Sequence, residues 1–171
     1  MVAVLLITLP AVAAVIVRWW AHPLDAAGLA AVTVVMGVLT VIDVRQHRLP
    51  DTVVVPLTVA VSAFVAGHAL AEGEPAGLVV PVAAGLGAST LFFLGWLAGG
   101  VGLGDVKLVF PLVLLVRWIG GDALWAAVLV TASVGGVAAV TVMMAGRGRS
   151  HRMAYGPYLA AGAVAGMLTG P

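Results

Sequence analysis

The chain has 171 residues, of which 63% are hydrophobic and only 9% are charged, and its formal net charge is +1. Soluble domains carry about 25% charged and about 45–50% apolar residues, so this composition excludes an ordinary water-soluble fold. The small net charge excludes the strongly basic surface typical of nucleic-acid-binding proteins. The chain contains no cysteine, which excludes disulfides, a thiol nucleophile and cysteine-ligated zinc. Because helices satisfy their own backbone hydrogen bonds in lipid, we expect a helical membrane protein.

A membrane-spanning helix needs about 20 mostly apolar residues, and the hydropathy pattern predicts seven such segments, or six if the short last one is re-entrant. The first lacks a basic n-region, so we interpret it as a helix and not as a cleaved signal. Its terminal Trp19 and Trp20 are expected at the membrane interface. We therefore expect an all-α, polytopic transmembrane bundle that forms a single domain over residues 1–171. The expected segments are residues 2–20, 26–42, 52–71, 78–98, 106–118, 122–145 and 155–169.

The basic residues predict the orientation of the bundle. If consecutive segments alternate in direction, Arg18 and Arg117 fall on one face of the membrane and the other basic residues fall on the opposite face. Cytoplasmic loops are enriched in Lys and Arg, so the N-terminus and the loops after the second, fourth and sixth segments are expected in the cytoplasm. The predicted location is the cell inner or plasma membrane. The basic residues assigned to the cytoplasmic face are Arg45, Arg48, Lys107, Arg147, Arg149 and Arg152.

Three aspartates are expected at the cytoplasmic boundary, namely Asp43, Asp51 and Asp105. Ionisable residues at membrane depth cost about 2.5–3.5 kcal/mol to insert and usually mark functional sites. Asp43 closes the second segment and Asp105 leads from a glycine-rich break into the fifth, so both are expected at the same depth. Two neighbouring carboxyl groups can share one proton, which lets one activate water while the other polarises an amide carbonyl. Taken singly, each aspartate also fits a helix-capping role.

Three short motifs surround these acids. In the first, Asp43 is followed seven residues later by Pro50 and then by Asp51. The second is Gly102-Leu-Gly-Asp-Val-Lys107, and the third is Tyr155-Gly-Pro-Tyr158. In this order, over residues 37–166, the motifs resemble the signatures of the prepilin peptidases, or type IV leader peptidases.

The resemblance implies an intramembrane aspartyl endopeptidase with Asp43 and Asp105 as its catalytic pair. Its substrates would be prepilins or pseudopilins, with Flp/Tad-like and archaellin-like ones among them, cut after a small residue ahead of their hydrophobic segment. Cutting would take place at the cytoplasmic face. Lys107 would orient its loop or meet an acidic residue of the substrate, and Asp51 would be structural. The residues implied to bind substrate or support the loops are Gly102, Gly104, Lys107, Pro50, Asp51, Gly156 and Pro157.

The same resemblance implies no metal, and we expect no other cofactor. The apolar composition predicts a lipid bilayer as the surroundings, and the small net charge predicts no nucleic-acid partner. The resemblance makes no prediction of the oligomeric state. Longer family members carry a cytoplasmic domain, often with paired cysteines, that is linked to N-methylation of the new terminus. This chain has no cysteine and no long loop, so we expect peptidase activity without N-methyltransferase activity.

A small proton- or ion-coupled membrane transporter is the alternative that the residues leave open. It would use Asp43 and Asp105 as its ion site, and it explains acids at membrane depth as well as a protease does. It does not explain the spacing between Asp43 and Pro50, or the presence of Lys107 in the second motif.

Overall fold

The computed structural model describes residues 2–46, 48–144 and 155–170. Within these ranges the chain forms seven α-helices and one short 3-10 helix, and no β-strand. Of the basic residues expected at the cytoplasmic face, Arg147, Arg149 and Arg152 lie outside the described residues. The elements are α1 (Val2–Arg18), α2 (Pro23–Gln46), α3 (Asp51–Ala71), η1 (Pro75–Leu78), α4 (Val79–Leu97), α5 (Leu103–Ile119), α6 (Gly121–Met144) and α7 (Gly156–Leu168).

The expected all-α polytopic bundle is confirmed. Among the described residues, four stretches are long and apolar enough to cross a membrane, and they are Pro23–Gln46, Asp51–Ala71, Pro75–Leu97 and Gly121–Thr141. The remaining helices are shorter, since α1 and α5 have 17 residues each and α7 has 13. At about 1.5 Å per residue, α7 is roughly 20 Å long, against a hydrocarbon core of about 30 Å. The number of spans therefore stays a prediction.

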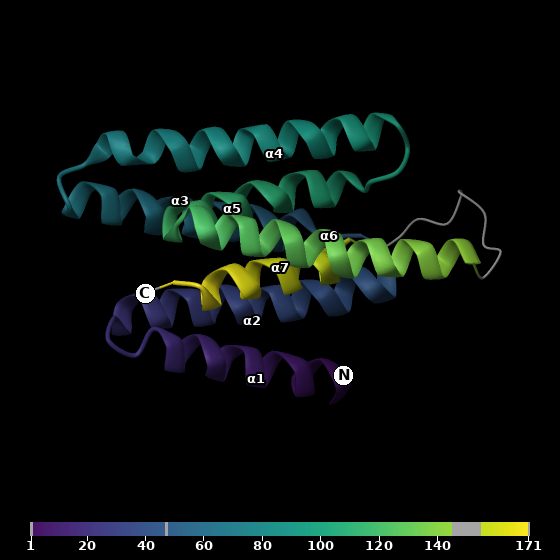
Figure 1. Cartoon of the computed structure of the whole chain (residues 1–171), viewed down its shortest axis with the longest axis horizontal. Coiled ribbons are helices and arrows are strands. Elements are labelled where there is room, and N and C mark those ends of the chain that lie inside the picture. Colours follow the sequence, from purple (N-terminus) through teal and green to yellow (C-terminus); the bar gives the residue numbers. More distant parts are fainter. Residues whose placement is uncertain (1, 47, 145–154, 171) are drawn as a thin grey trace.

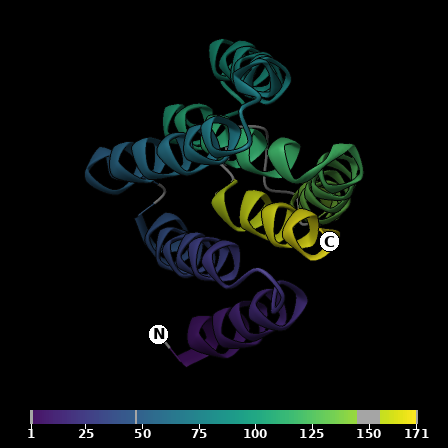
Figure 2. The same ribbon diagram turned by 90° about the vertical axis from the view of Figure 1, so that its left-hand side faces the viewer.

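The helices lie side by side with their axes along the length of the bundle (Figure 1). α4 lies at one outer side and α1 at the other, with the remaining helices between them (Figure 2). The C-terminal ends of α2 and α4 and the N-terminal ends of α3 and α5 gather at one end of the bundle. This alternation brings Asp43, in the last turn of α2, and Asp105, in the first turn of α5, to the same end.

The core lies mainly between α2, α3 and α5. On α3, Val54, Leu57, Val61 and Val65 recur every three or four residues, and none of them is more than 5% exposed. Such spacing places the four side chains on one face of the helix. They belong to the same buried cluster as Leu29, Met36 and Leu39 of α2 and Leu108, Leu112 and Leu115 of α5.

The outward faces of the helices are apolar as well. On the peripheral helix α4, Leu86, Leu91, Phe93 and Leu94 are between 42% and 70% exposed. A contiguous apolar surface of this kind is an association or membrane surface and not a solvated one. Hydrocarbon solvates these side chains, and the helical backbone keeps its hydrogen bonds.

Trp19 packs inside the bundle, and its position at the membrane interface stays a prediction. Its side chain is 4% exposed, and its indole Nε1–H donates a hydrogen bond of 2.8 Å to the backbone carbonyl of Met167 near the end of α7. A buried indole needs such a partner, and a carbonyl at a helix C-terminus has no partner within its own helix. The side chain of Trp20 is 79% exposed, and its interfacial role stays a prediction.

A polar pair links α2 and α3 at the end of the bundle opposite to Asp43 and Asp105. The Nε2 atom of His68 lies 2.7 Å from Oδ1 of Asp25. The ring of Trp118 on α5 packs edge-on against His68, with the centroids 4.9 Å apart. Each of these polar groups therefore has a partner inside the bundle, so neither is left as an isolated ionisable group at membrane depth.

We expect Gly162→Val to lower the stability of the bundle by about 1–3 kcal/mol, since overpacking at a tight contact is destabilising. A Cβ at Gly162 on α7 would clash with the Thr131 hydroxyl and lie 2.5 Å from the Ala127 carbonyl oxygen on α6. The matched control is Gly67→Val on α3, where a Cβ meets nothing within 4 Å. Thermal unfolding in detergent measures both variants. Equal unfolding temperatures would contradict the tight α6–α7 contact.

Candidate active site

A cavity of about 630 Å³ opens at the end of the bundle where α2 and α4 end and α3 and α5 begin. Most of the residues predicted to form the site line it. These are Asp43, Pro50, Asp51, Gly102, Gly104, Asp105 and Lys107. Gly156 does not line the cavity but contacts one of its carboxyl groups, and Pro157 is not among the lining residues. The structure therefore brings both predicted carboxyl groups into one cavity.

Asp43 is held by the start of α7. Its side chain is 4% exposed, and its Oδ2 accepts a hydrogen bond of 2.9 Å from the backbone N–H of Gly156. A Cβ at Gly156 would lie 2.7 Å from that oxygen, so only glycine lets the helix start approach so closely. Asp43 therefore lies inside the last turn of α2, which continues to Gln46, and a segment distant in the sequence contacts its carboxyl group.

Asp105 lies inside the first turn of α5 and is not its N-cap. The N-cap is Gly102, whose backbone N–H donates a hydrogen bond of 3.3 Å to Oδ2 of Asp105. The other oxygen, Oδ1, is buried and has no hydrogen-bond partner among the described residues. Helix capping thus accounts for one oxygen of this carboxyl and leaves the other for a molecule in the cavity.

The two carboxyl groups interact. Asp105 is 5% exposed, and it lies close enough to Asp43 for the charge of one carboxyl to act on the other. Two buried like charges favour a state in which only one of the pair is ionised. This arrangement can supply a proton acceptor and a proton donor from two chemically identical side chains.

Close packing fixes the first turn of α5 against the connection between α2 and α3. A Cβ at Gly104 would lie 2.8 Å from the Cβ of Leu49, so the small residue allows the contact. Upstream, Gly99 has a φ of +79°, a conformation that favours glycine. Gly104 of the second motif therefore permits a tight approach beside Asp105, and Gly99, upstream of the motif, permits a sharp turn.

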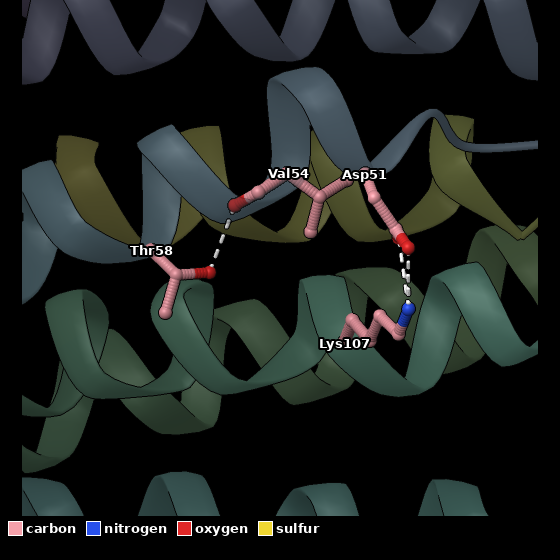
Figure 3. Close-up of polar contacts among 4 residues, drawn as sticks. All are labelled: Asp51, Val54, Thr58 and Lys107. Carbon is pink, nitrogen blue, oxygen red and sulfur yellow. Dashed lines mark hydrogen bonds and ion pairs between the residues drawn. The ribbon is translucent and has the colours of Figure 1, made fainter.

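Lys107 and Asp51 form an ion pair at the cavity wall (Figure 3). Lys107 Nζ donates to both carboxylate oxygens of Asp51, each at 2.8 Å. The pair joins the start of α3 to α5. The side chain of Lys107 is 42% exposed and that of Asp51 is 62% exposed. Figure 3 also shows the Thr58 hydroxyl donating to the Val54 carbonyl at 2.9 Å, a contact within α3. Of the roles expected for Lys107, the contact favours orientation of the loop, and recognition of an acidic substrate residue stays a prediction.

We expect Lys107→Met to lower the free energy of unfolding by less than about 1 kcal/mol, because exposed ion pairs contribute little. The neighbouring Leu108 is fully buried, and Leu108→Ala should cost about 2–5 kcal/mol. Thermal or denaturant unfolding of both variants in the same detergent measures the contrast. A larger effect from Lys107→Met than from Leu108→Ala would show that the ion pair carries the packing of α3 against α5.

Several lining residues were not predicted as site residues. They are Gln46, Arg48, Leu49, Trp96, Gly99, Gly100, Val101 and Leu103. Trp96 precedes the glycine-rich break by one helical turn, and this spacing could have indicated that its side chain lies near the site. Pro157 occupies the first turn of α7, where proline favours a helix start. Among the described residues, no group of three or more His, Asp or Glu side chains is placed to hold a metal ion.

The fold and the cavity define a polytopic membrane protein with two buried, interacting carboxyl groups at one end. The sequence model of the type IV leader peptidase family matches residues 30–144, which is more than half of the 171 residues. The chain belongs to this family, whose members are prepilin leader peptidases of the aspartic type. The match includes the motifs around Asp43 and Asp105 and ends before Gly156. No curated protein and no solved structure gives a match.

Proposed function

We propose that this chain is an intramembrane aspartyl endopeptidase that removes the leader peptide of type IV prepilins or pseudopilins, with Asp43 and Asp105 as its catalytic pair. The observation that carries the proposal is the shared cavity, in which two buried carboxyl groups from α2 and α5 meet. Membership of the leader peptidase family supplies the reaction class. The shared cavity supports Asp43 and Asp105 as the reacting residues.

The chemistry follows from the pairing of the acids. The ionised carboxyl takes a proton from a water molecule, and the oxygen of that water attacks the scissile carbonyl carbon. The protonated carboxyl donates a hydrogen bond to the carbonyl oxygen and then a proton to the departing amine. The Gly156 N–H fixes Asp43, and Oδ1 of Asp105 has hydrogen-bonding capacity to spare. Both groups can thus reach a substrate while their orientation is held.

The position of the cavity suits cleavage at a membrane boundary. It opens at one end of the bundle, beside the ends of helices that are apolar along their length. A leader that ends just ahead of a hydrophobic segment places its scissile bond at this depth. By the distribution of basic residues this end faces the cytoplasm, with the enzyme in the cell inner or plasma membrane. We further propose that the chain cuts without methylating the new terminus.

The test is cleavage by the purified protein in liposomes. The panel consists of a type IV prepilin, a pseudopilin, a Flp-type prepilin and an archaellin precursor, with product termini identified by mass spectrometry. We expect at least one substrate to be cut once, after a small residue ahead of its hydrophobic segment, and to carry no methyl group. A double variant with Asp43→Asn and Asp105→Asn serves as the inactive control.

The proposal is overturned if the wild-type protein cuts no member of the panel. If the same liposomes then show proton flux that the double variant abolishes, the two aspartates would be assigned to an ion site.

A further inference from the structure

A second cavity, of about 490 Å³, lies along the side of the bundle between α4 and α6. We call it the α4–α6 groove, because α4 and α6 form its walls and α5 and α7 its floor. Figure 2 shows α4 and α6 on either side of α5. Its lining is apolar or small apart from Thr131 and Tyr155. The groove and the cavity that holds the two aspartates share no lining residue.

The groove has the length and floor of a helix-binding site. On α6 its lining runs from Leu124 to Ala139, a rise of roughly 22 Å in a helix, which is most of a hydrocarbon core of about 30 Å. Ala132 and Gly136 line it one turn apart, the small-xxx-small spacing that lets membrane helices approach closely. A Cβ at Gly136 would meet nothing within 4 Å. There is therefore open space along this wall.

Two elements connect the groove to the aspartates. On α4, Phe92 lines the groove and Trp96, one turn further along the same face, lines the cavity. At the start of α7, Tyr155 lines the groove and the next residue, Gly156, donates its hydrogen bond to Asp43. The rings of Phe92 and Tyr155 meet edge to face with centroids 6.3 Å apart. This aromatic pair therefore lies at the end of the groove that is nearest to the cavity with the two aspartates.

A third cavity, of about 440 Å³ between α2 and α3, is also apolar. On α3 its lining begins at Thr52, next to Asp51 of the catalytic cavity, but on α2 it ends at Val35, which is roughly 12 Å along the helix from Asp43 at 1.5 Å per residue. It has no contact with α7, the helix that holds Asp43. The α4–α6 groove is the apolar cavity that reaches a residue adjoining the Asp43 contact.

We propose that the α4–α6 groove binds the hydrophobic helix of the prepilin substrate, an inference that rests on the proposed function. A substrate cut just ahead of its hydrophobic segment must occupy both the catalytic cavity and a membrane-facing surface at once. The groove supplies that surface, and the Phe92–Tyr155 pair marks the point at which the substrate backbone leaves the groove for the two aspartates. A lipid acyl chain, the competing occupant, has no need of a continuous path to the aspartates.

The absence of cysteine from the chain makes disulfide cross-linking a direct test. Gly136→Cys is compared with Gly87→Cys, each in an Asp43→Asn background that prevents cleavage. Gly87 is a matched control, because it also lies in an exposed helix where a Cβ meets nothing within 4 Å, but it does not line the groove. Each panel prepilin carries one cysteine in its hydrophobic segment, and a membrane-soluble oxidant forms the bond. We expect at least tenfold more cross-linked product with Gly136→Cys.

A cleavage assay gives an independent readout. Gly136→Leu, with intact aspartates, should raise KM for prepilin at least tenfold because the added side chain fills the groove, whereas Gly87→Leu should not. Leucine favours helix more than glycine does, so neither change weakens its helix. Equal cross-linking at the two positions, with wild-type cleavage intact, would overturn the proposal that the groove binds the substrate helix. It would leave the proposed peptidase function unaffected. Cross-linking specific to Gly136→Cys, with no cleavage by wild type, would overturn the peptidase and leave a pilin-helix binding site.

Discussion

Replacement of either Asp43 or Asp105 by asparagine is expected to lower the rate of prepilin cleavage by about 10³-fold, within the range that general acid–base groups contribute. Asparagine keeps the size of the side chain and can still accept the hydrogen bond from Gly156 or Gly102. It can neither take a proton from water nor give one up at neutral pH. The loss should therefore fall on the chemical step. Co-expression of each variant with a substrate, followed by quantification of mature and precursor pilin, measures it.

Asp122→Asn is the control for this pair of substitutions. Asp122 lies in the first turn of α6 and is exposed, outside the set of residues that line the cavity. It should cleave at the wild-type rate. Membrane levels of all three variants must match that of the wild type. If Asp43→Asn or Asp105→Asn were to retain cleavage within tenfold of wild type, the carboxyl pair would not be the catalytic device.

Gly156→Ala is expected to lower kcat for prepilin cleavage by about 10²-fold, the cost of a displacement of roughly 1 Å at a reacting group. The added Cβ would lie 2.7 Å from Oδ2 and 3.2 Å from Cγ of Asp43, so the carboxyl must move from its place. Gly156 acts through Asp43 and is a positioning residue, so KM should change little. Steady-state kinetics on a soluble prepilin fusion in detergent separates the two constants.

The matched control for that substitution is Gly121→Ala. Both glycines open a helix, Gly156 that of α7 and Gly121 that of α6, but a Cβ at Gly121 meets nothing within 4 Å. Gly121→Ala should leave kcat and the unfolding temperature unchanged. A fall in kcat for Gly156→Ala with no larger effect in Gly156→Val would argue against steric displacement of Asp43, because the bulkier residue must displace it further.

The helices could be predicted closely because polar residues interrupt the apolar runs at few places. The largest differences lie at the two ends of α2 and at the start of α5. The fifth segment was expected from residue 106, but α5 begins at Leu103, because the Asp105 carboxylate accepts the Gly102 N–H and stabilises an earlier first turn. The second segment was expected over residues 26–42, but α2 runs from Pro23 to Gln46, so that Asp43 lies inside the last turn and its carboxyl accepts a hydrogen bond from Gly156 of α7. A hydropathy pattern cannot predict either of these hydrogen bonds.

The candidate site could be predicted as a set of residues but not as a set of contacts. Alternation of the segments places Asp43 and Asp105 at one end, and the resemblance adds Gly156 as a supporting residue. That Gly156 donates to Asp43 depends on how α7 packs in three dimensions. The pairing of Lys107 with Asp51 depends likewise on the distance between α3 and α5. Hydropathy and spacing fix where a residue lies along its helix, and the neighbours of that helix decide what it touches.

The hydrogen bond between Asp43 and Gly156 spans 113 positions of the chain, and this has a consequence for biosynthesis. During synthesis the ribosome completes α2 and α5 before α7, so the two carboxyl groups are made before the Gly156 N–H is available to Asp43. We expect a chain that stops before α7 to lack this hydrogen bond and to hold the Asp43 carboxyl less firmly. Under the proposed function, cleavage would then depend on the packing of α7 against Asp43.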